Sequence, residues 1–213
     1  MRAARRTVGN FLLIKDRVKN MKICVFGAAS SAIDTDFKIK VEELGKEMVK
    51  RGHSLVFGGG ANGLMGAVAD GVYAEKGHIL GVIPKFFDDE DVEEVFPHCS
   101  ELIEPDTMRQ RKQIMEDNAD AFIIVPGGIG TFEEFFEILT LKQLCRHEKP
   151  IAIYNLQNYY DEMQVMMRAA VEKGFLRQEC LALYKVTTDL EELFAYIEGP
   201  AQVNKTVKQL KDG

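Results

Sequence analysis

A strand, a turn almost without side chains and a helix follow one another at residues 121–145, and this junction constrains the fold more than any other segment. The strand is the apolar run A-F-I-I-V at 121–125, which is typical of a parallel strand covered on both faces. The turn is P-G-G-I-G at 126–130, and we expect a helix from Thr131 to Cys145. The junction therefore predicts a parallel sheet covered by helices.

The turn also predicts an anion site. Gly127, Gly128 and Gly130 let an anion approach the backbone amides and the positive end of the helix dipole. Thr131 can cap the helix and donate its hydroxyl to the same ligand. Glu134 lies about one helical turn further on, beside the anion, where it suits a sugar hydroxyl or a water. The alternative is a capping box, S/T-x-x-E, which needs no ligand.

A second glycine cluster occurs at 58–63, where G-G-G-A-N-G satisfies the dinucleotide pattern G-x-G-x-x-G. Such a fold needs an acidic residue at the end of the next strand to hold the ribose diol, and the run H-I-L-G-V-I-P at 78–84 has none. The match is therefore weak support for NAD. Another small-residue loop, G-A-A-S-S at 27–31, follows a first strand. In a parallel sheet these loops gather at the carboxyl ends of the strands, where ligands bind.

Three cations lie in the helix-forming run M-R-Q-R-K-Q-I-M at 108–115. Arg111 and Met115 share one helix face at i, i+4, whereas Arg109 and Lys112 share another at i, i+3. The cations therefore cannot all point into one site, and spacing leaves open which arginine does. The alternative is an ordinary solvated helix face.

Five motifs, in order, resemble those of the Lonely Guy (LOG) family. They are F-G-G-G at 57–60, G-L-M-G at 63–66, G-V-I-P at 81–84, M-x-x-R-K at 108–112 and P-G-G-x-G-T-x-x-E at 126–134. Members of this family are cytokinin riboside 5′-monophosphate phosphoribohydrolases, and some relatives were once labelled lysine decarboxylases. The resemblance implies hydrolysis of the N-glycosidic bond of a purine nucleoside 5′-monophosphate, either of cytokinin type or AMP, to free base and ribose 5-phosphate.

The resemblance also implies the roles of individual residues. Arg111 and Glu134 are the expected catalytic pair. The resemblance thereby selects Arg111 among the three cations at 108–115, which residue spacing did not do. The expected substrate-binding residues are Gly58, Gly59, Gly60, Met108, Lys112, Gly127, Gly128, Gly130 and Thr131. No cofactor is implied. A homodimer is expected from the resemblance and from the apolar-rich helix at 132–145, although this helix could also be sandwiched within its own domain.

Two rival functions stay open. One is a nucleotide-binding sensor that does no chemistry, and the presence of both Arg111 and Glu134 argues against it. The other is a pyridoxal-phosphate decarboxylase, which needs a lysine placed to form a Schiff base. Lys85 and Lys112 are available, yet neither lies in a context that requires this role.

Composition agrees with a cytoplasmic enzyme. A chain of 213 residues that is 46% hydrophobic fits one sizeable domain, and a net charge of −6 argues against a general nucleic-acid binder. No apolar run reaches the roughly 18 residues that a membrane helix needs. The histidines form no metal-ligand pattern. The cysteines show no C-x-x-C spacing and read as reduced thiols, with two in apolar elements, Cys24 and Cys145.

The predicted architecture is a single α/β domain, doubly wound and Rossmann-like, with a mostly parallel sheet at 21–198. Strands are expected near 22–27, 54–58, 79–83, 99–103, 121–126, 150–154 and 183–187. The basic segment 1–20 lacks a signal-peptide core and is expected to be a dispensable extension. Residues 199–213 are expected to form a loosely docked tail.

Overall fold

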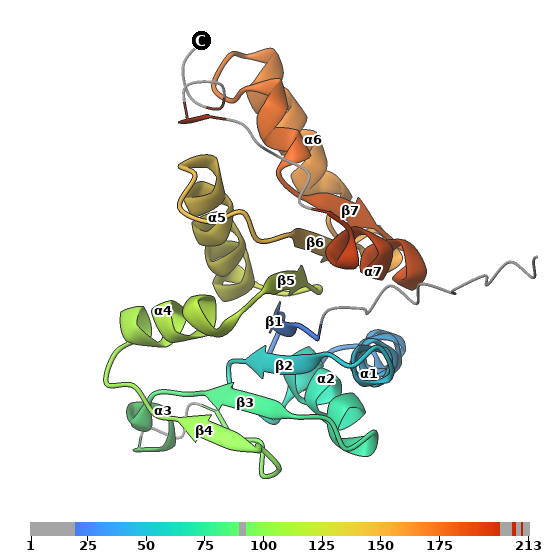
Figure 1. The fold of residues 1–213 in the computed structure, drawn as a ribbon, viewed down its shortest axis with the longest axis vertical. Coiled ribbons are helices and arrows are strands. Elements are labelled where there is room, and N and C mark those ends of the chain that lie inside the picture. The colour runs from blue at the N-terminus through green and yellow to red at the C-terminus, as the bar shows by residue number, and fades with distance from the viewer. Residues whose placement is uncertain (1–19, 90–92, 201–205, 208–209, 211–213) are drawn as a thin grey trace, which may run out of the picture.

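The computed structural model describes residues 20–89, 93–200, 206, 207 and 210, so the extension expected at 1–20 lies outside the described residues except for its last residue. One sheet of seven strands has the order β4-β3-β2-β1-β5-β6-β7, seen in Figure 1 with β4 as the lowest strand and β7 as the highest, below α6. The strands are β1 (Lys22–Phe26), β2 (Ser54–Phe57), β3 (Ile79–Val82), β4 (Glu101–Ile103), β5 (Ala121–Ile124), β6 (Ile151–Tyr154) and β7 (Lys185–Thr187).

Every neighbouring pair of strands is parallel, and each strand lies within two residues of its predicted bounds. The helices are α1 (Thr35–Lys50), α2 (Gly63–Ala74), α3 (Lys85–Asp89), α4 (Met108–Asn118), α5 (Ile129–Gln143), α6 (Asp161–Glu172) and α7 (Leu190–Glu198). Two short 3-10 helices lie at Leu156–Asn158 and Gln178–Ala182. The predicted α/β class is confirmed.

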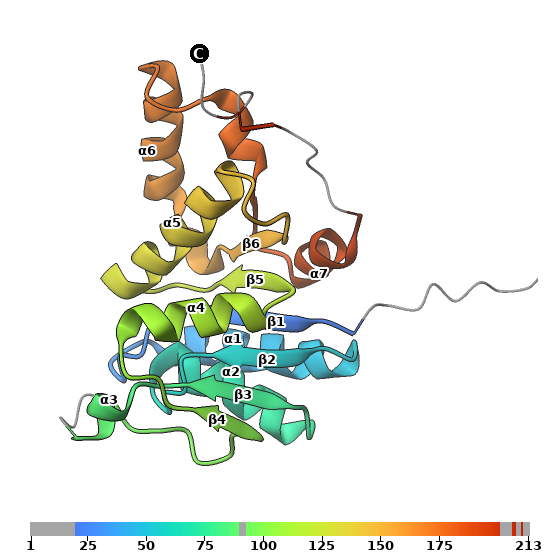
Figure 2. The same ribbon diagram turned by 60° about the vertical axis from the view of Figure 1, so that its left-hand side comes forward.

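Alternate side chains of each strand point to opposite faces of the sheet. Both sets are apolar in the central strands, so helices cover both faces. One core contains buried residues of α1, α2 and α7, and the other contains buried residues of α4, α5 and α6. In Figure 2, α4 lies in front of β1, whereas α1 and α2 lie behind the strands. The central strands β1, β2, β3, β5 and β6 are almost wholly buried, as their apolar sequences require.

The direction of winding reverses at β1. Successive strands run outward from β1 to β4, and the chain then returns to place β5 on the other side of β1. Ligands of open α/β sheets bind at such a switch point, outside the carboxyl ends of the strands. The fold therefore places its site where β1, β2 and β5 end.

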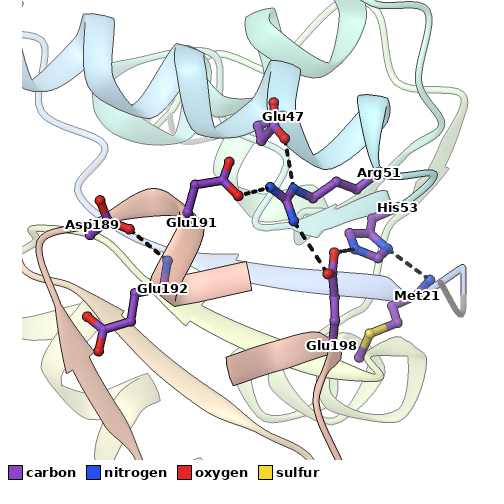
Figure 3. Close-up of polar contacts among 8 residues, drawn as sticks. All are labelled: Met21, Glu47, Arg51, His53, Asp189, Glu191, Glu192 and Glu198. Atoms are coloured by element: carbon purple, nitrogen blue, oxygen red, sulfur yellow. Dashed lines mark hydrogen bonds and ion pairs between the residues drawn. The ribbon is translucent and has the colours of Figure 1, made fainter. Parts of the chain in front are cut away.

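A polar network closes the opposite end of the sheet (Figure 3). His53 is 3% exposed; its Nδ1 accepts the backbone N–H of Met21, so Nε2 carries the proton and donates to Glu198 at 3.0 Å. Arg51 stacks over Phe194 and pairs with three carboxylates, those of Glu47, Glu191 and Glu198. These contacts fix α7 to the amino ends of β1 and β2, away from the switch point.

Two expectations around α5 were wrong. The helix begins at Ile129, with Gly128 at its N-cap, so Thr131 lies inside the first turn and is not the cap. Glycine allows the turn to run directly into the helix without a side-chain cap. Cys145 follows the end of α5 with a φ of +54° and is exposed, so it is not a core thiol. Cys24 is buried as expected.

Other expectations concern the outer elements. Phe135, Ile138 and Leu139 of α5 are buried within their own domain, so the apolar content of this helix gives no support for a dimer. In the tail, Leu210 is 1% exposed and its carbonyl accepts from Gln143, which docks the chain at that point. No helix among the described residues is both long enough and apolar enough to span a membrane.

Candidate active site

A cavity of about 320 Å³ opens at the switch point. Its walls come from the ends of β1, β2 and β5 and from the facing sides of α4 and α5. The lining residues are Val25, Phe26, Gly27, Ala28, Ala29, Ser30, Gly58, Gly60, Met65, Glu93, Arg111, Met115, Gly128, Gly130, Thr131 and Glu134. This volume lies at the lower end of the range for small-molecule sites. The cavity unites all three loops that the sequence singled out.

Arg111 is the cation that faces the cavity. The residue is 8% exposed, with its Nε donating to the Val82 carbonyl and its Nη2 to the Gly58 carbonyl, each at 3.0 Å. Arg109, two positions earlier, is exposed. Thr107 caps α4 in a capping box with Gln110 and so fixes the start of the helix. The guanidinium is therefore held in one orientation, and its other N–H groups are available to a ligand.

The glycines at the end of β2 leave space for the side chains of Arg111 and Glu93. A Cβ on Gly58 would lie 2.0 Å from Nη2 of Arg111, and one on Gly60 would lie 1.7 Å from a carboxylate oxygen of Glu93. Gly59 has a φ of +82° and faces Ile83 instead of the cavity. The G-x-G spacing here therefore admits two charged side chains, which explains why it resembles a dinucleotide fingerprint without being one.

The turn after β5 leaves the amino end of α5 open to the cavity. A Cβ atom added to Gly128 or Gly130 would have no neighbouring atom within 4 Å. No side chain caps the amino end of α5. Gly127 lies behind the turn, where its bare Cα accommodates the buried side chain of Thr131. Tyr159 donates to the Gly127 carbonyl at 2.7 Å and holds the turn in place. The uncapped amides and the helix dipole favour a bound anion.

Glu134 lies one turn into α5 and lines the same cavity. Burial raises the pKa of its carboxyl to about 7, and the positive charge of Arg111 acts in the opposite direction. Among the ion pairs of the described residues, none joins Glu134 to Arg111. The two groups therefore line the same cavity without forming an ion pair with each other. A carboxyl that titrates near neutral pH suits general acid–base chemistry.

This raised pKa predicts that Glu134→Gln stabilises the folded protein at pH 8. The stabilising contribution of the protonated carboxyl is complete below its ordinary pKa of 4.5 and is lost as the pH rises through about 7. Taken in full, the rise in the pKa of Glu134 corresponds to about 3 kcal/mol in the free energy of unfolding. Because Glu134 is only partly buried, we expect a gain of roughly 1–2 kcal/mol from the substitution. Urea unfolding of both proteins at pH 5 and pH 8 measures this gain. An equal gain at both pH values would contradict it.

Glu93 is the charged cavity residue that sequence reasoning missed. It lies on an irregular segment after α3, with no motif around it, and reaches the cavity only through the tertiary fold. Burial raises the pKa of its carboxyl, and Arg111 lowers it. No local sequence signal distinguishes Glu93 from the other acids nearby.

Four predicted substrate-binding residues do not line the cavity, namely Gly59, Gly127, Met108 and Lys112. Met108 is 38% exposed at the start of α4. Lys112 pairs with Glu133 and with Glu137, at 2.6 Å from the latter, and so joins α4 to α5. Lys112 thereby holds together the two helices that carry Arg111 and Glu134.

Comparison with known proteins assigns the family. Residues 65–197 match the family model described as "Possible lysine decarboxylase". The probable cytokinin riboside 5′-monophosphate phosphoribohydrolase LOG6 of Arabidopsis thaliana is 38% identical over 176 residues, which cover 83% of this chain and 87% of the relative. The chain belongs to the LOG family. A second LOG relative from the same plant, cytokinin riboside 5′-monophosphate phosphoribohydrolase LOG2, is 36% identical over 177 residues and is covered to 82%.

Solved structures agree with the LOG assignment at the level of the fold. The molybdenum cofactor binding protein from Rippkaea orientalis has a TM-score of 0.64 and 20% identity, with 84% of this chain and 96% of that chain covered. At this identity the likeness concerns the fold alone. The Rossmann-like arrangement of the LOG chain is thereby confirmed.

The historical decarboxylase label of the LOG family receives no support from the cavity. Its described lining residues include no lysine to form a Schiff base. Lys85 is exposed, and Lys112 is held by the two carboxylates of α5. Within the described part of this LOG chain there is likewise no group of three or more His, Cys, Asp or Glu side chains that could hold a metal ion.

Proposed function

We propose that this chain hydrolyses the N-glycosidic bond of purine nucleoside 5′-monophosphates, of cytokinin type or AMP, to free base and ribose 5-phosphate. The observation that carries the proposal is one cavity that combines an uncapped helix end with the separated charges of Arg111 and Glu134. The names of its relatives, which describe phosphoribohydrolases, support the same reaction. A sensor would need the helix end for affinity but would not need a carboxyl that titrates near neutral pH.

The mechanism follows from the positions of these groups. The phosphate binds the amides of the turn at 128–131, and this remote binding energy orients the ribose between Arg111 and Glu134. The C1′–N9 bond breaks with its electron pair on the base, which takes up a proton from solvent. A water oxygen bonds to C1′ and gives its proton to the Glu134 carboxylate, which returns it to solvent after the products leave. The negative charge of Glu134 also stabilises the cationic, oxocarbenium-like sugar of the transition state.

Phosphate recognition predicts a strong preference for AMP over adenosine. Two or more hydrogen bonds from backbone amides to a charged group would raise kcat/KM for AMP by about 10³-fold. Thr131→Val should lower kcat/KM for AMP by roughly tenfold and leave adenosine unaffected, because it removes only a hydroxyl at the anion site. Liquid chromatography of released adenine measures both.

Thr140→Val is the matched control, since Thr140 is exposed on the same helix and does not line the cavity. Equal rates on AMP and adenosine would contradict phosphate binding at α5. Parallel rates on isopentenyladenosine monophosphate decide between a cytokinin nucleotide and AMP as the preferred substrate.

We also propose a homodimer working in the cytoplasm. The resemblance to LOG proteins supports the dimer, and so does Ile129, an apolar residue at the start of α5 beside the cavity that is 88% exposed. A second copy of the chain covering this rim would exclude water from the bound nucleotide.

A further inference from the structure

Two consecutive tyrosines hold the turn after β5. The Tyr160 hydroxyl donates to the Val125 carbonyl at 2.8 Å, and the Tyr159 hydroxyl donates to the Gly127 carbonyl at 2.7 Å. The two rings meet edge to face, with their centroids 5.0 Å apart. Neither tyrosine is among the residues that line the cavity. Both therefore act on the backbone of the turn from outside the site.

The loop after β6 is built to present these two side chains. Gln157 and Asn158 have φ values of +51° and +61°. Residues other than glycine adopt this left-handed conformation at an energetic cost, and such residues persist where surrounding contacts enforce them, often at functional sites. Asn155 supplies one such contact, because it is 4% exposed and its Oδ1 accepts the Tyr160 N–H at 2.7 Å. The loop thereby directs two successive hydroxyls to the turn.

The Tyr159 hydrogen bond fixes the orientation of the Gly127–Gly128 peptide. In a trans peptide the C=O and the N–H point in opposite directions. A Gly127 carbonyl held toward Tyr159 therefore turns the Gly128 N–H away from Tyr159, and Gly128 lines the cavity. The preceding peptide is fixed in a similar way, since the Pro126 carbonyl accepts the Ala28 N–H at 3.1 Å. A peptide between two glycines rotates with little steric hindrance, so its orientation depends on the Tyr159 bond.

The orientation of this peptide decides how the turn interacts with an anion. As the peptide stands, its N–H adds to the unpaired amides at the amino end of α5 and favours negative charge. With the peptide turned over, the carbonyl oxygen of Gly127 would face the same anion and repel it. A single hydroxyl outside the cavity thus controls whether one peptide of the turn attracts or repels a phosphate.

We propose that Tyr159 is a positioning residue for the phosphate of the substrate, acting through the Gly127–Gly128 peptide. This inference rests on the proposed function and adds the residue that sets affinity for a 5′-phosphate. Tyr159 contacts no atom of the nucleotide and takes no part in proton transfer.

The first test is Tyr159→Phe, which removes the hydroxyl and keeps the ring. We expect KM for AMP to rise about tenfold, through loss of a hydrogen bond to a charged group, while kcat stays within about twofold. For adenosine, which has no phosphate, kcat/KM should stay at the parental value. Tyr73→Phe is the matched control, since Tyr73 is 50% exposed, lies on α2 and does not line the cavity; it should match the parent on both substrates.

A second background tests whether Tyr159 acts by orienting the peptide. Gly128 has a φ of −91°, which alanine also adopts, whereas a turned-over peptide would bring this φ to positive values, which alanine avoids. In a Gly128→Ala background, Tyr159→Phe should therefore raise KM for AMP by less than about twofold over Gly128→Ala alone. An equal tenfold rise in both backgrounds would overturn the proposed route.

An unchanged KM for AMP in Tyr159→Phe, or parallel losses on AMP and adenosine, would also overturn the positioning role. Calorimetric titration of the same variants with AMP and adenosine measures the contrast without turnover. A parent that binds AMP through Tyr159 but releases no adenine would refute the proposed function and support the positioning role. A parent that binds AMP no more tightly than adenosine would overturn the positioning role itself.

Discussion

Glu134→Gln is expected to lose about 10³-fold in turnover of AMP while retaining the fold and most of the AMP affinity. Glutamine keeps the shape of the side chain but can neither accept a proton from water nor stabilise a cationic sugar by charge. The phosphate contacts at the turn are unchanged, so ground-state binding remains. Single-turnover rates give the loss, and calorimetry with AMP gives the affinity.

The matched control is Glu133→Gln. Glu133 is the adjacent carboxylate on α5, but its side chain is 54% exposed and pairs with Lys112 outside the cavity. We expect near-parental turnover for this variant. A Glu134→Gln protein that hydrolyses AMP at the parental rate would show that Glu134 is not catalytic.

Gly58→Ala is expected to lower kcat by roughly 10²-fold, although it adds only a methyl group to a residue with no catalytic atoms. The added Cβ would lie 2.0 Å from Nη2 of Arg111, so the guanidinium has to leave its position. Gly58 does not have a positive φ, so alanine fits its backbone. Arg111→Met should produce a loss of similar size, whereas Arg109→Met, on the exposed face of α4, should produce none.

The double variant Gly58→Ala, Arg111→Met separates this displacement from general damage. If Gly58→Ala acts through Arg111, adding it to Arg111→Met should lower kcat by less than about twofold, because the group it displaces is already absent. Losses that multiply in the double variant would indicate that Gly58→Ala disrupts the cavity in another way. Circular dichroism and thermal unfolding of each variant check the fold.

Local patterns were enough to predict the sheet, because each central strand is a short apolar run that must be buried on both faces. They were also enough to place the turn at 126–130 at the mouth of a cavity. Helix periodicity paired Arg111 with Met115, and both line the cavity. Choosing Arg111 over Arg109 needed either the family resemblance or the structure.

What the sequence did not reveal depends on contacts between distant segments. Glu93 is 33 residues beyond Gly60 and meets it only because residues 93–96 return to the edge of β2. Lys112 follows Arg111 directly, yet its side chain pairs with carboxylates of the next helix outside the cavity. Neither fact has a signature in residue spacing.

The most direct test of the proposed reaction is a product analysis of AMP after incubation with the parent protein and with Glu134→Gln. The parent should release adenine and ribose 5-phosphate in equal amounts, with no adenosine and no inorganic phosphate, and Glu134→Gln should release neither at a comparable rate. Release of adenosine and phosphate would mean that a different bond is cut. Stable binding of AMP with no products would contradict the assignment of this chain as an enzyme.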